Sequence, residues 1–140
     1  MADSPAAGFD GLRLRHWRPQ RREDGVLVLQ FDRADAPVNA FSQDVLIELA
    51  DVLERIAIDP PKGVVIASAK ASGFIAGADL KEFQEFDRKG TVDDAIRRGQ
   101  DVFQRLAELP CPTVAAIHGF CMGGGTEISL ACRYRVASND

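Results

Sequence analysis

The sequence predicts an α/β fold in which buried strands alternate with helices. Two short apolar runs that contain β-branched residues, 63–69 and 113–118, have the length and composition of buried strands. Apolar residues at helical spacing occupy 45–56, ahead of the first run, and 92–109, ahead of the second. Strands separated by helices need crossover connections, so we expect these strands to lie parallel in one sheet.

A hairpin is expected ahead of the first helix. Residues 1–10 show no periodic apolar pattern and are expected to be a loose lead-in to one domain over 11–140. Apolar and charged residues alternate over 12–17, which predicts a strand, and residues 18–25 are then expected to form a turn. The apolar run 26–31 predicts the second strand of the hairpin.

The first helix has recognisable boundaries. After a loop over 31–41, the side chain of Ser42 can cap the first turn. The segment "DPPKG", residues 59–63, is expected to end the helix because proline has no N–H to donate within it. The strand 63–69 then follows directly.

The chain after residue 70 repeats this alternation. A glycine-containing loop over 70–83 is expected to enter a short helical turn. Thr91 and Asp94 match the capping-box pattern at the start of the second long helix, and two prolines after residue 109 end that helix. Residues 133–137 predict a last strand.

Composition indicates a globular domain. The chain has 140 residues, of which 46% are hydrophobic and 27% charged. The formal net charge of -4 argues against a nucleic-acid partner, and the arginines within 13–22 are interpreted as a solvated strand face and turn. No apolar run approaches the about 20 residues of a membrane span, and the N-terminus lacks the apolar core of a signal peptide. We therefore expect a cytoplasmic protein, whose three cysteines lack metal-ligand spacing.

Three consecutive glycines, Gly123, Gly124 and Gly125, lie between the strand at 113–118 and an apolar helical segment. Glycine weakens regular elements because it loses the most backbone entropy on folding, so the run needs a reason. A Walker A loop requires lysine where Gly125 stands, and a dinucleotide-binding loop requires glycine where Ile128 stands. Both nucleotide-binding motifs are therefore disfavoured.

Two interpretations of the glycines stay open. In the first, they only let a strand and a helix pack closely, and Glu127 is favourable to the helix dipole. In the second, the N–H of Gly124 donates to a substrate carbonyl that gains negative charge, and Glu127 transfers a proton one turn later. Such an oxyanion hole needs a second donor. The small residues Ala76, Gly77 and Ala78 are expected at the same carboxyl edge of the sheet.

The two glycine-containing motifs, "AGADLKEF" and "HGFCMGGGTEISLAC", resemble those of the enoyl-CoA hydratase/isomerase family, the crotonase superfamily. The resemblance covers about 12–140, and "AIHGFCMGGG" and "RVASND" are most similar to the N-terminal hydratase part of multifunctional fatty-acid β-oxidation proteins. It implies a crotonase-like α/β spiral of ββα units, of which only the N-terminal part is present. It also implies a homo-oligomer, as a trimer or hexamer, or a multifunctional β-oxidation complex.

The resemblance also implies site residues by their positions in these motifs. The backbone N–H groups of Ala78 and Gly124 are implied to form the oxyanion hole for a thioester carbonyl. Glu127 is implied to be one of two catalytic carboxylates, the second lying beyond the end of the sequence. Asp79 is interpreted mainly as a helix cap, and Lys81 either contacts a nucleotide phosphate or is solvated. Contacts to the acyl-CoA substrate are implied for Ala76, Gly77, Asp79, Leu80, Lys81, Val38, Ala40 and Gly123.

The reaction implied by the resemblance is syn addition of water to a trans-2-enoyl-CoA in fatty-acid β-oxidation. No metal or redox cofactor is implied, because coenzyme A enters as part of the thioester substrate. Two alternatives stay open: a Δ3-Δ2-enoyl-CoA isomerase, and a non-catalytic acyl-CoA-binding or assembly module. Because the second carboxylate is missing, we expect the 140-residue chain to be inactive alone.

Overall fold

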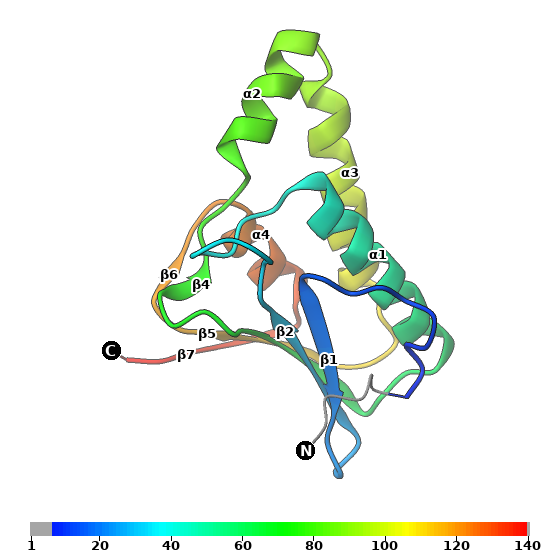
Figure 1. Cartoon of the computed structure of the whole chain (residues 1–140). Coiled ribbons are helices and arrows are strands. Elements are labelled where there is room, and N and C mark those ends of the chain that lie inside the picture. Colours follow the sequence, from blue (N-terminus) through cyan, green and yellow to red (C-terminus); the bar gives the residue numbers. More distant parts are fainter. Residues whose placement is uncertain (1–6, 140) are drawn as a thin grey trace.

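The computed structural model describes residues 7–139, which form one sheet of five strands and one of two. In Figure 1 the helices lie on one side of the larger sheet, and α2 projects away from it together with the start of α3. In chain order the elements are β1 (Trp17–Arg21), β2 (Val26–Phe31), α1 (Gln43–Ile58), β3 (Gly63–Ser68), β4 (Gly73–Ile75), α2 (Leu80–Lys89), α3 (Val92–Ala107), β5 (Thr113–Ile117), β6 (Phe120–Cys121), α4 (Gly124–Ala131) and β7 (Tyr134–Ala137).

The larger sheet has the strand order β1-β2-β3-β5-β7. β1 and β2 pair antiparallel as a hairpin, whereas β2, β3, β5 and β7 run parallel. The expected parallel arrangement is thus confirmed, and the loops that follow β3 and β5 leave the sheet at the same edge. Beyond this edge β4 and β6 pair in parallel with each other. Their pairing brings the loop after β4 next to the glycine loop after β6.

The first strand lies further along the chain than predicted. β1 begins at Trp17, so the prediction of a strand over 12–17 and a turn from residue 18 is wrong in its boundaries. The buried carboxylate of Glu48 on α1 accepts the backbone N–H groups of Arg15, His16 and Trp17 at 2.8 to 3.1 Å. Because the Glu48 carboxylate accepts these N–H groups, they are not available to a neighbouring strand. The segment before Trp17 therefore lies against α1.

The N-terminal lead-in is packed where the structure describes it, whereas residues 1–6 lie outside the described residues. Phe9 is 1% exposed and belongs to the core, with the guanidinium of Arg21 5.6 Å from its ring centroid. Arg55 of α1 donates hydrogen bonds to two backbone carbonyls of the same segment. The expectation of a loose segment fails over 7–10, because one isolated aromatic residue gives no periodic signal but stabilises by about 2 kcal/mol when buried.

Helix α1 begins and ends where the sequence predicts. The Ser42 side chain accepts a hydrogen bond from the Val45 N–H, and Asp59 follows the last helical residue. One face of the helix is buried against the sheet, as its apolar spacing predicts. The buried residues of α1 are Val45, Leu46, Glu48, Leu49, Val52, Leu53 and Ile56.

A row of aromatic rings crosses the core beneath α1. Trp17 stacks on Phe31 with ring centroids 4.3 Å apart, and Phe31 lies 5.6 Å from Phe41. Phe41 in turn meets Phe103 of α3 edge-on at 5.2 Å. Aromatic pairs in these geometries add to the stabilisation from burial alone. The row connects the hairpin to the helices that enclose the cavity described below.

The loop predicted over 70–83 contains regular structure that the sequence analysis missed. It includes the short strand β4 and opens into the ten-residue helix α2, which is longer than the expected single turn. Asp79 caps α2 by accepting the Glu82 N–H, and Gly90 ends it in the left-handed conformation with φ of 71°. Most residues of α2 are charged, so the spacing of apolar residues gives only a weak indication of this helix.

Helix α3 starts at the predicted place but without the predicted capping box. Within residues 7–139 the Thr91 hydroxyl caps none of the first N–H groups of α3, and it lies 3.5 Å from the Phe86 carbonyl oxygen. Gly90 ends α2 one residue earlier, so Thr91 belongs to a tight turn between two helices. Its φ and ψ of -113° and 17° differ from the extended backbone of a capping residue.

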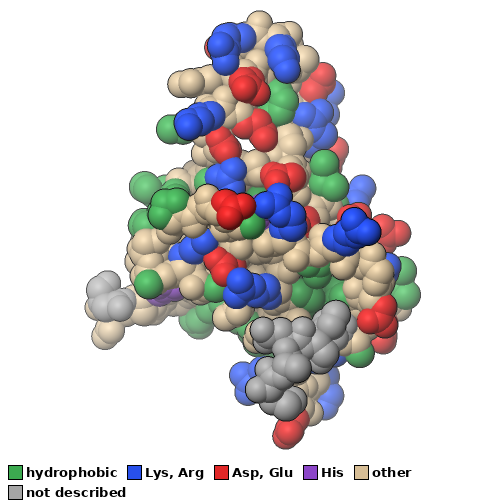
Figure 2. Space-filling view, viewed as in Figure 1, with side chains coloured by type: hydrophobic (Ala, Val, Ile, Leu, Met, Phe, Trp, Pro, Cys, Tyr) green, Lys and Arg blue, Asp and Glu red, His purple; other side chains and the backbone are tan. Residues whose placement is uncertain are grey.

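Charged side chains of both signs cover the face seen in Figure 2. Lys and Arg are interspersed with Asp and Glu, including over the projecting part of α2 and α3. The formal net charge of the chain is -4. Within residues 7–139, none of the helices combines the length and the apolar character needed to cross a bilayer.

Candidate active site

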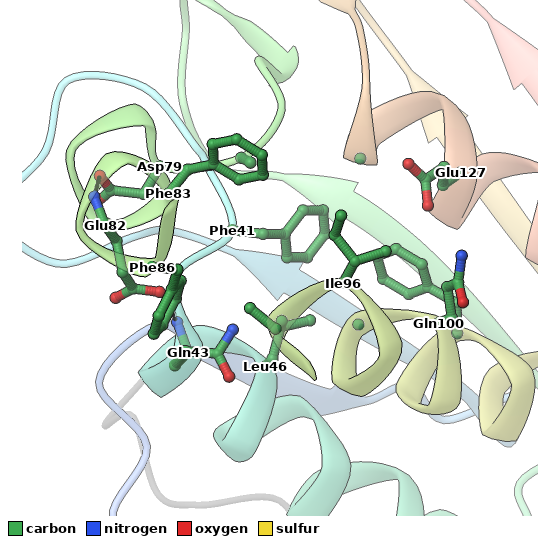
Figure 3. Close-up of a pocket in the computed structure, with 15 residues that line it drawn as sticks. Phe41, Gln43, Leu46, Asp79, Glu82, Phe83, Phe86, Ile96, Gln100 and Glu127 are labelled. Atoms are coloured by element: carbon green, nitrogen blue, oxygen red, sulfur yellow. Dashed lines mark hydrogen bonds between the residues drawn. The ribbon is translucent and has the colours of Figure 1, made fainter. Parts of the chain in front are cut away.

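A cavity of about 320 Å³ opens between the α2–α3 pair and the starts of α1 and α4. In Figure 3, Glu127 lies on one side of the cavity and Asp79 and Glu82 lie on the other, with Phe41 and Ile96 between them. The lining residues are Phe41, Gln43, Leu46, Ala78, Asp79, Glu82, Phe83, Phe86, Ala95, Ile96, Gly99, Gln100, Phe103, Gly124 and Glu127.

Each of the three consecutive glycines has its own steric reason. Gly123 has φ of 52°, and a Cβ there would lie 3.4 Å from the Cα of Gly77 in the neighbouring loop. A Cβ at Gly125 would lie only 2.7 Å from the Ile75 carbonyl oxygen, and one at Gly124 would meet a buried aromatic ring at 2.7 Å. Close packing therefore accounts for the run of glycines. The same close packing places the start of α4 directly against β4.

Ala78 is held by a parallel bridge to Phe41. The Phe41 N–H donates to the Gly77 carbonyl, and the Asp79 N–H donates to the Phe41 carbonyl, both at 2.8 Å. In such a bridge, the residue between the two bonded neighbours turns its own N–H to the opposite side. The Ala78 N–H is therefore directed away from Phe41, and Ala78 lines the cavity.

Gly124 is the first residue of α4, so its N–H has no acceptor within the helix. The N–H groups of Gly125 and Glu127 donate to carbonyls of the preceding turn. Among the described residues, neither the Gly124 N–H nor the Ala78 N–H has an acceptor. Two unpaired backbone donors from adjacent loops thus line one cavity. An oxyanion hole requires a pair of donors of this kind.

Glu127 lies in the first turn of α4, one turn after Gly124, and is exposed at the cavity. Over residues 7–139, no hydrogen bond or ion pair holds its carboxylate. The Glu127 carboxylate is therefore available to a bound molecule. Its place beside an unpaired N–H suits proton transfer close to a polarised carbonyl.

Asp79 also lines the cavity, but its carboxylate is engaged. One oxygen accepts the Glu82 N–H at 3.1 Å, and the other lies 2.5 Å from the Arg33 guanidinium. The hydrogen bond from Arg33 lowers the pKa of Asp79, against the opposing effect of burial. An ionised, capping Asp79 is what the sequence analysis favoured over a catalytic one.

Glu82 is a third carboxyl at the cavity, which the sequence analysis did not single out. Its Oε1 accepts the Gln43 N–H, the first of α1, at 2.7 Å. Burial raises the pKa of Glu82, and the nearby charges of Asp79 and Asp44 act in the same direction. A side chain that caps a different helix leaves no signal at local spacing, so only the folded chain reveals it.

The apolar wall of the cavity was missed as well. Phe83 and Phe86 lie three residues apart on α2, and Ile96 and Phe103 come from α3. The i, i+3 spacing of the two phenylalanines was the available sequence signal. In the described part of the chain, seven predicted contact residues lie outside the lining: Val38, Ala40, Ala76, Gly77, Leu80, Lys81 and Gly123.

The sequence matches one family model and a set of individual relatives. The model of the enoyl-CoA hydratase/isomerase family matches residues 21–140. The chain is 38% identical over 121 residues to the fatty acid oxidation complex subunit alpha of Shewanella sp. (strain W3-18-1). It is 39% identical over 119 residues to that of Shewanella halifaxensis (strain HAW-EB4). These matches cover 86% and 84% of this chain but only 17% of each relative.

Solved structures resemble the fold over most of the chain. An enoyl-CoA hydratase from Bacillus anthracis superposes with a TM-score of 0.79 at 32% identity, over 87% of this chain and 47% of its own. Pseudomonas aeruginosa DspI superposes with a TM-score of 0.84 at 29% identity, over 96% of this chain and 53% of its own. This chain therefore spans about half of each solved relative.

Proposed function

The chain belongs to the enoyl-CoA hydratase/isomerase family, and from that premise we propose that it forms part of an enoyl-CoA hydratase. Its α/β fold is the crotonase-like fold of the solved relatives, of which it covers about half. The proposed substrate is a trans-2-enoyl-CoA thioester. One observation carries the proposal: the unpaired N–H groups of Ala78 and Gly124 and the free carboxylate of Glu127 share one cavity.

In the proposed mechanism, the thioester carbonyl accepts hydrogen bonds from the N–H groups of Ala78 and Gly124. The water oxygen bonds to the β carbon, and the electrons of the double bond move toward the thioester oxygen. The two N–H groups stabilise this enolate charge better than they stabilise the ground-state carbonyl. One carboxylate takes a proton from the attacking water and another carboxyl delivers one to the α carbon, so that one water molecule is added overall.

Glu127 supplies one of these two carboxylates. Within the described residues the other two carboxyls of the cavity are engaged, Asp79 with Arg33 and Glu82 with Gln43. We therefore assign the second proton transfer to a carboxyl of the natural polypeptide outside residues 7–139. The apolar wall built by α2 and α3 is proposed to hold the acyl chain, because it offers aromatic and aliphatic surface next to the donors.

The relatives suggest the metabolic setting. They are named as alpha subunits of a fatty acid oxidation complex. We accordingly propose a role in fatty-acid β-oxidation, either within such a complex or as a trimer or hexamer of identical subunits. Coenzyme A enters as part of the substrate, and the proposed chemistry uses protein groups alone.

A Δ3-Δ2-enoyl-CoA isomerase is the second candidate, and a specific observation favours it. Glu127 is the one cavity carboxylate in residues 7–139 that no other group of the chain engages. A single base can remove a proton from one carbon of an enolate system and return it to another. The same pair of backbone donors stabilises the enolate in both reactions.

The test replaces Glu127 by Gln in the natural polypeptide that carries this sequence, with Glu54→Gln as an exposed control on α1. Both crotonyl-CoA hydration and isomerisation of a 3-enoyl-CoA are measured. We expect Glu127→Gln to lower hydration by about 10²-fold or more and the control to match the wild type. Hydration at the wild-type rate in Glu127→Gln refutes the assignment. A wild type that isomerises but does not hydrate supports the second candidate instead.

A further inference from the structure

Asn39 is a fully buried polar residue that lies beside the candidate site without lining it. We infer that Asn39 is a positioning residue, whose side-chain amide fixes the loop that aims the Ala78 N–H into the cavity. The inference rests on the proposed function, since it concerns one donor of the proposed oxyanion hole. No role for Asn39 followed from its place in the sequence.

The amide of Asn39 joins three strands. Its Nδ2 carries two hydrogens and lies within hydrogen-bond distance of three acceptors, so one N–H is shared: the Phe31 carbonyl at 2.9 Å, the Ser68 Oγ at 3.0 Å and the Phe74 carbonyl at 3.1 Å. These acceptors belong to β2, β3 and β4. One amide nitrogen therefore sets how the small sheet, which carries the Ala78 loop, meets the large sheet.

The opposite end of the amide fixes its orientation. Asn39 Oδ1 accepts the Arg33 N–H at 2.9 Å. A flipped amide would place its oxygen against the carbonyls of Phe31 and Phe74 and its NH₂ against the Arg33 N–H. Only an amide offers both donors and an acceptor at these places, because a carboxylate at neutral pH accepts and does not donate.

Three backbone hydrogen bonds connect the segment that contains Asn39 to the segment that contains Ala78. The Asn39 carbonyl accepts the Ala76 N–H, and Phe41 exchanges hydrogen bonds with Gly77 and Asp79 on either side of Ala78. All three bonds are 2.8 Å long. The segment 39–41 thus acts as a short strand against 76–79, and its own placement depends on the buried amide.

A second connection reaches Ala78 from its other side. Arg33, whose N–H is held by Asn39, contacts the carboxylate of Asp79 with its guanidinium at 2.5 Å. Asp79 follows Ala78 directly and caps α2. Both neighbours of the Ala78 N–H are therefore tied, through short chains of hydrogen bonds, to one buried side chain. Donor position matters because misplacement by about 1 Å at a reacting centre can lower a rate about 10²-fold.

The experiment compares Asn39→Ala with Thr113→Val in the natural polypeptide. Thr113 is buried to a similar degree. It is the first residue of β5, whereas the candidate site lies beyond the last residues of the strand, and its Oγ1 accepts the Arg133 N–H. We expect Asn39→Ala to lower kcat for hydration about 10- to 100-fold while KM changes less than about threefold. We expect Thr113→Val to lower the melting temperature and leave kcat unchanged.

Amide hydrogen exchange of the same proteins supplies a readout that does not need catalysis. We expect Asn39→Ala to speed exchange at the N–H groups of Phe41, Ala76 and Asp79, and Thr113→Val to leave them unchanged. Wild-type kcat in Asn39→Ala, or a lowered kcat without faster exchange in this loop, overturns the inference.

Two further outcomes are distinguished. If Asn39→Ala does not fold, Asn39→Ser retains one donor and is tested in its place, and a wild-type kcat in that variant overturns the inference. A wild-type protein without hydratase activity refutes the proposed function, and exchange alone then decides whether Asn39 holds the loop.

Discussion

Ala78 offers a cleaner test of the proposed donor pair than Gly124, since any side chain at Gly124 would strike the ring of Phe41. Ala78→Pro removes the backbone N–H, and among residues 7–139 that N–H forms no hydrogen bond that the substitution could break. We expect kcat to fall about 10²- to 10³-fold, as for loss of one oxyanion donor.

Ala78→Ser is the matched control for this substitution. It keeps the N–H and adds one oxygen at an exposed position, so we expect activity within a few-fold of the wild type. Crotonyl-CoA hydration and circular dichroism of both variants provide the measurement. A folded Ala78→Pro variant with the kcat of Ala78→Ser would contradict the assignment of Ala78 as a donor.

The ion pair between Arg33 and Asp79 makes a prediction about pH. Arg33 lowers the pKa of Asp79 in the folded chain, so the pair contributes stability above the unfolded pKa of about 4 and loses it as the pH falls through the folded pKa. Asp79→Asn keeps a good capping residue and removes the charge. We expect the wild type to be more stable by about 1 kcal/mol at neutral pH and the difference to vanish at low pH. Urea unfolding across this range measures it, and a pH-independent difference would count against the ion pair.

Among the helices, α2 has the weakest connection to the core. None of its residues is buried, and it is tied to the rest of the chain by Glu82 at the first N–H of α1 and by Asp79 at Arg33. Local stability follows burial and hydrogen bonding. We expect amides of α2 to exchange faster than the buried middle of α1. Glu82→Ala should speed exchange in α2, whereas Glu85→Ala, one turn on and exposed, should not.

The elements that could be predicted are those with a strong local pattern. α1, β3, α3, β5 and β7 follow from apolar spacing, prolines and a capping serine, and the structure confirms them within a few residues. The predicted start of β1 was wrong because the carboxylate of Glu48, distant in sequence, accepts the N–H groups of His16 and Trp17. The length of α2 was missed because most of its residues are charged and its apolar signal is limited to the spacing of Phe83 and Phe86. At the start of β1 a tertiary contact decided what local propensity could not.

At the scale of the whole molecule, the motifs predicted which backbone groups meet, because the fold brings two loops to one sheet edge. Ala78, Asp79, Gly124 and Glu127 line one cavity as a result. The parts that could not be predicted depend on long-range contacts: the apolar wall from α2 and α3, Glu82 as a cap for α1, and the buried amide of Asn39. The cap and the buried amide produce no recognisable spacing in the sequence, and the helical spacing of the apolar residues on α2 and α3 does not indicate which cavity they line.

The polypeptide of residues 1–140, prepared alone, is the subject of the last prediction. The proposed hydration uses two carboxylates, and in residues 7–139 only Glu127 is free at the cavity. The edge strand β7 and the outer face of α4 expose Leu130, Tyr134 and Val136 to 67%, 61% and 58%. An unpaired strand edge next to apolar side chains favours association between copies.

We therefore expect this polypeptide to self-associate and to show no measurable hydration of crotonyl-CoA. Intact mass establishes that the material is residues 1–140, sedimentation gives its oligomeric state, and the hydration assay gives its activity. Replacing Leu130 and Val136 by Lys should reduce association without restoring activity, because charge protects an exposed edge but supplies no acid or base. A verified monomer that turned over at ordinary enzyme rates, about 10 per second, would require a second acid within these residues and would contradict the two-carboxylate mechanism.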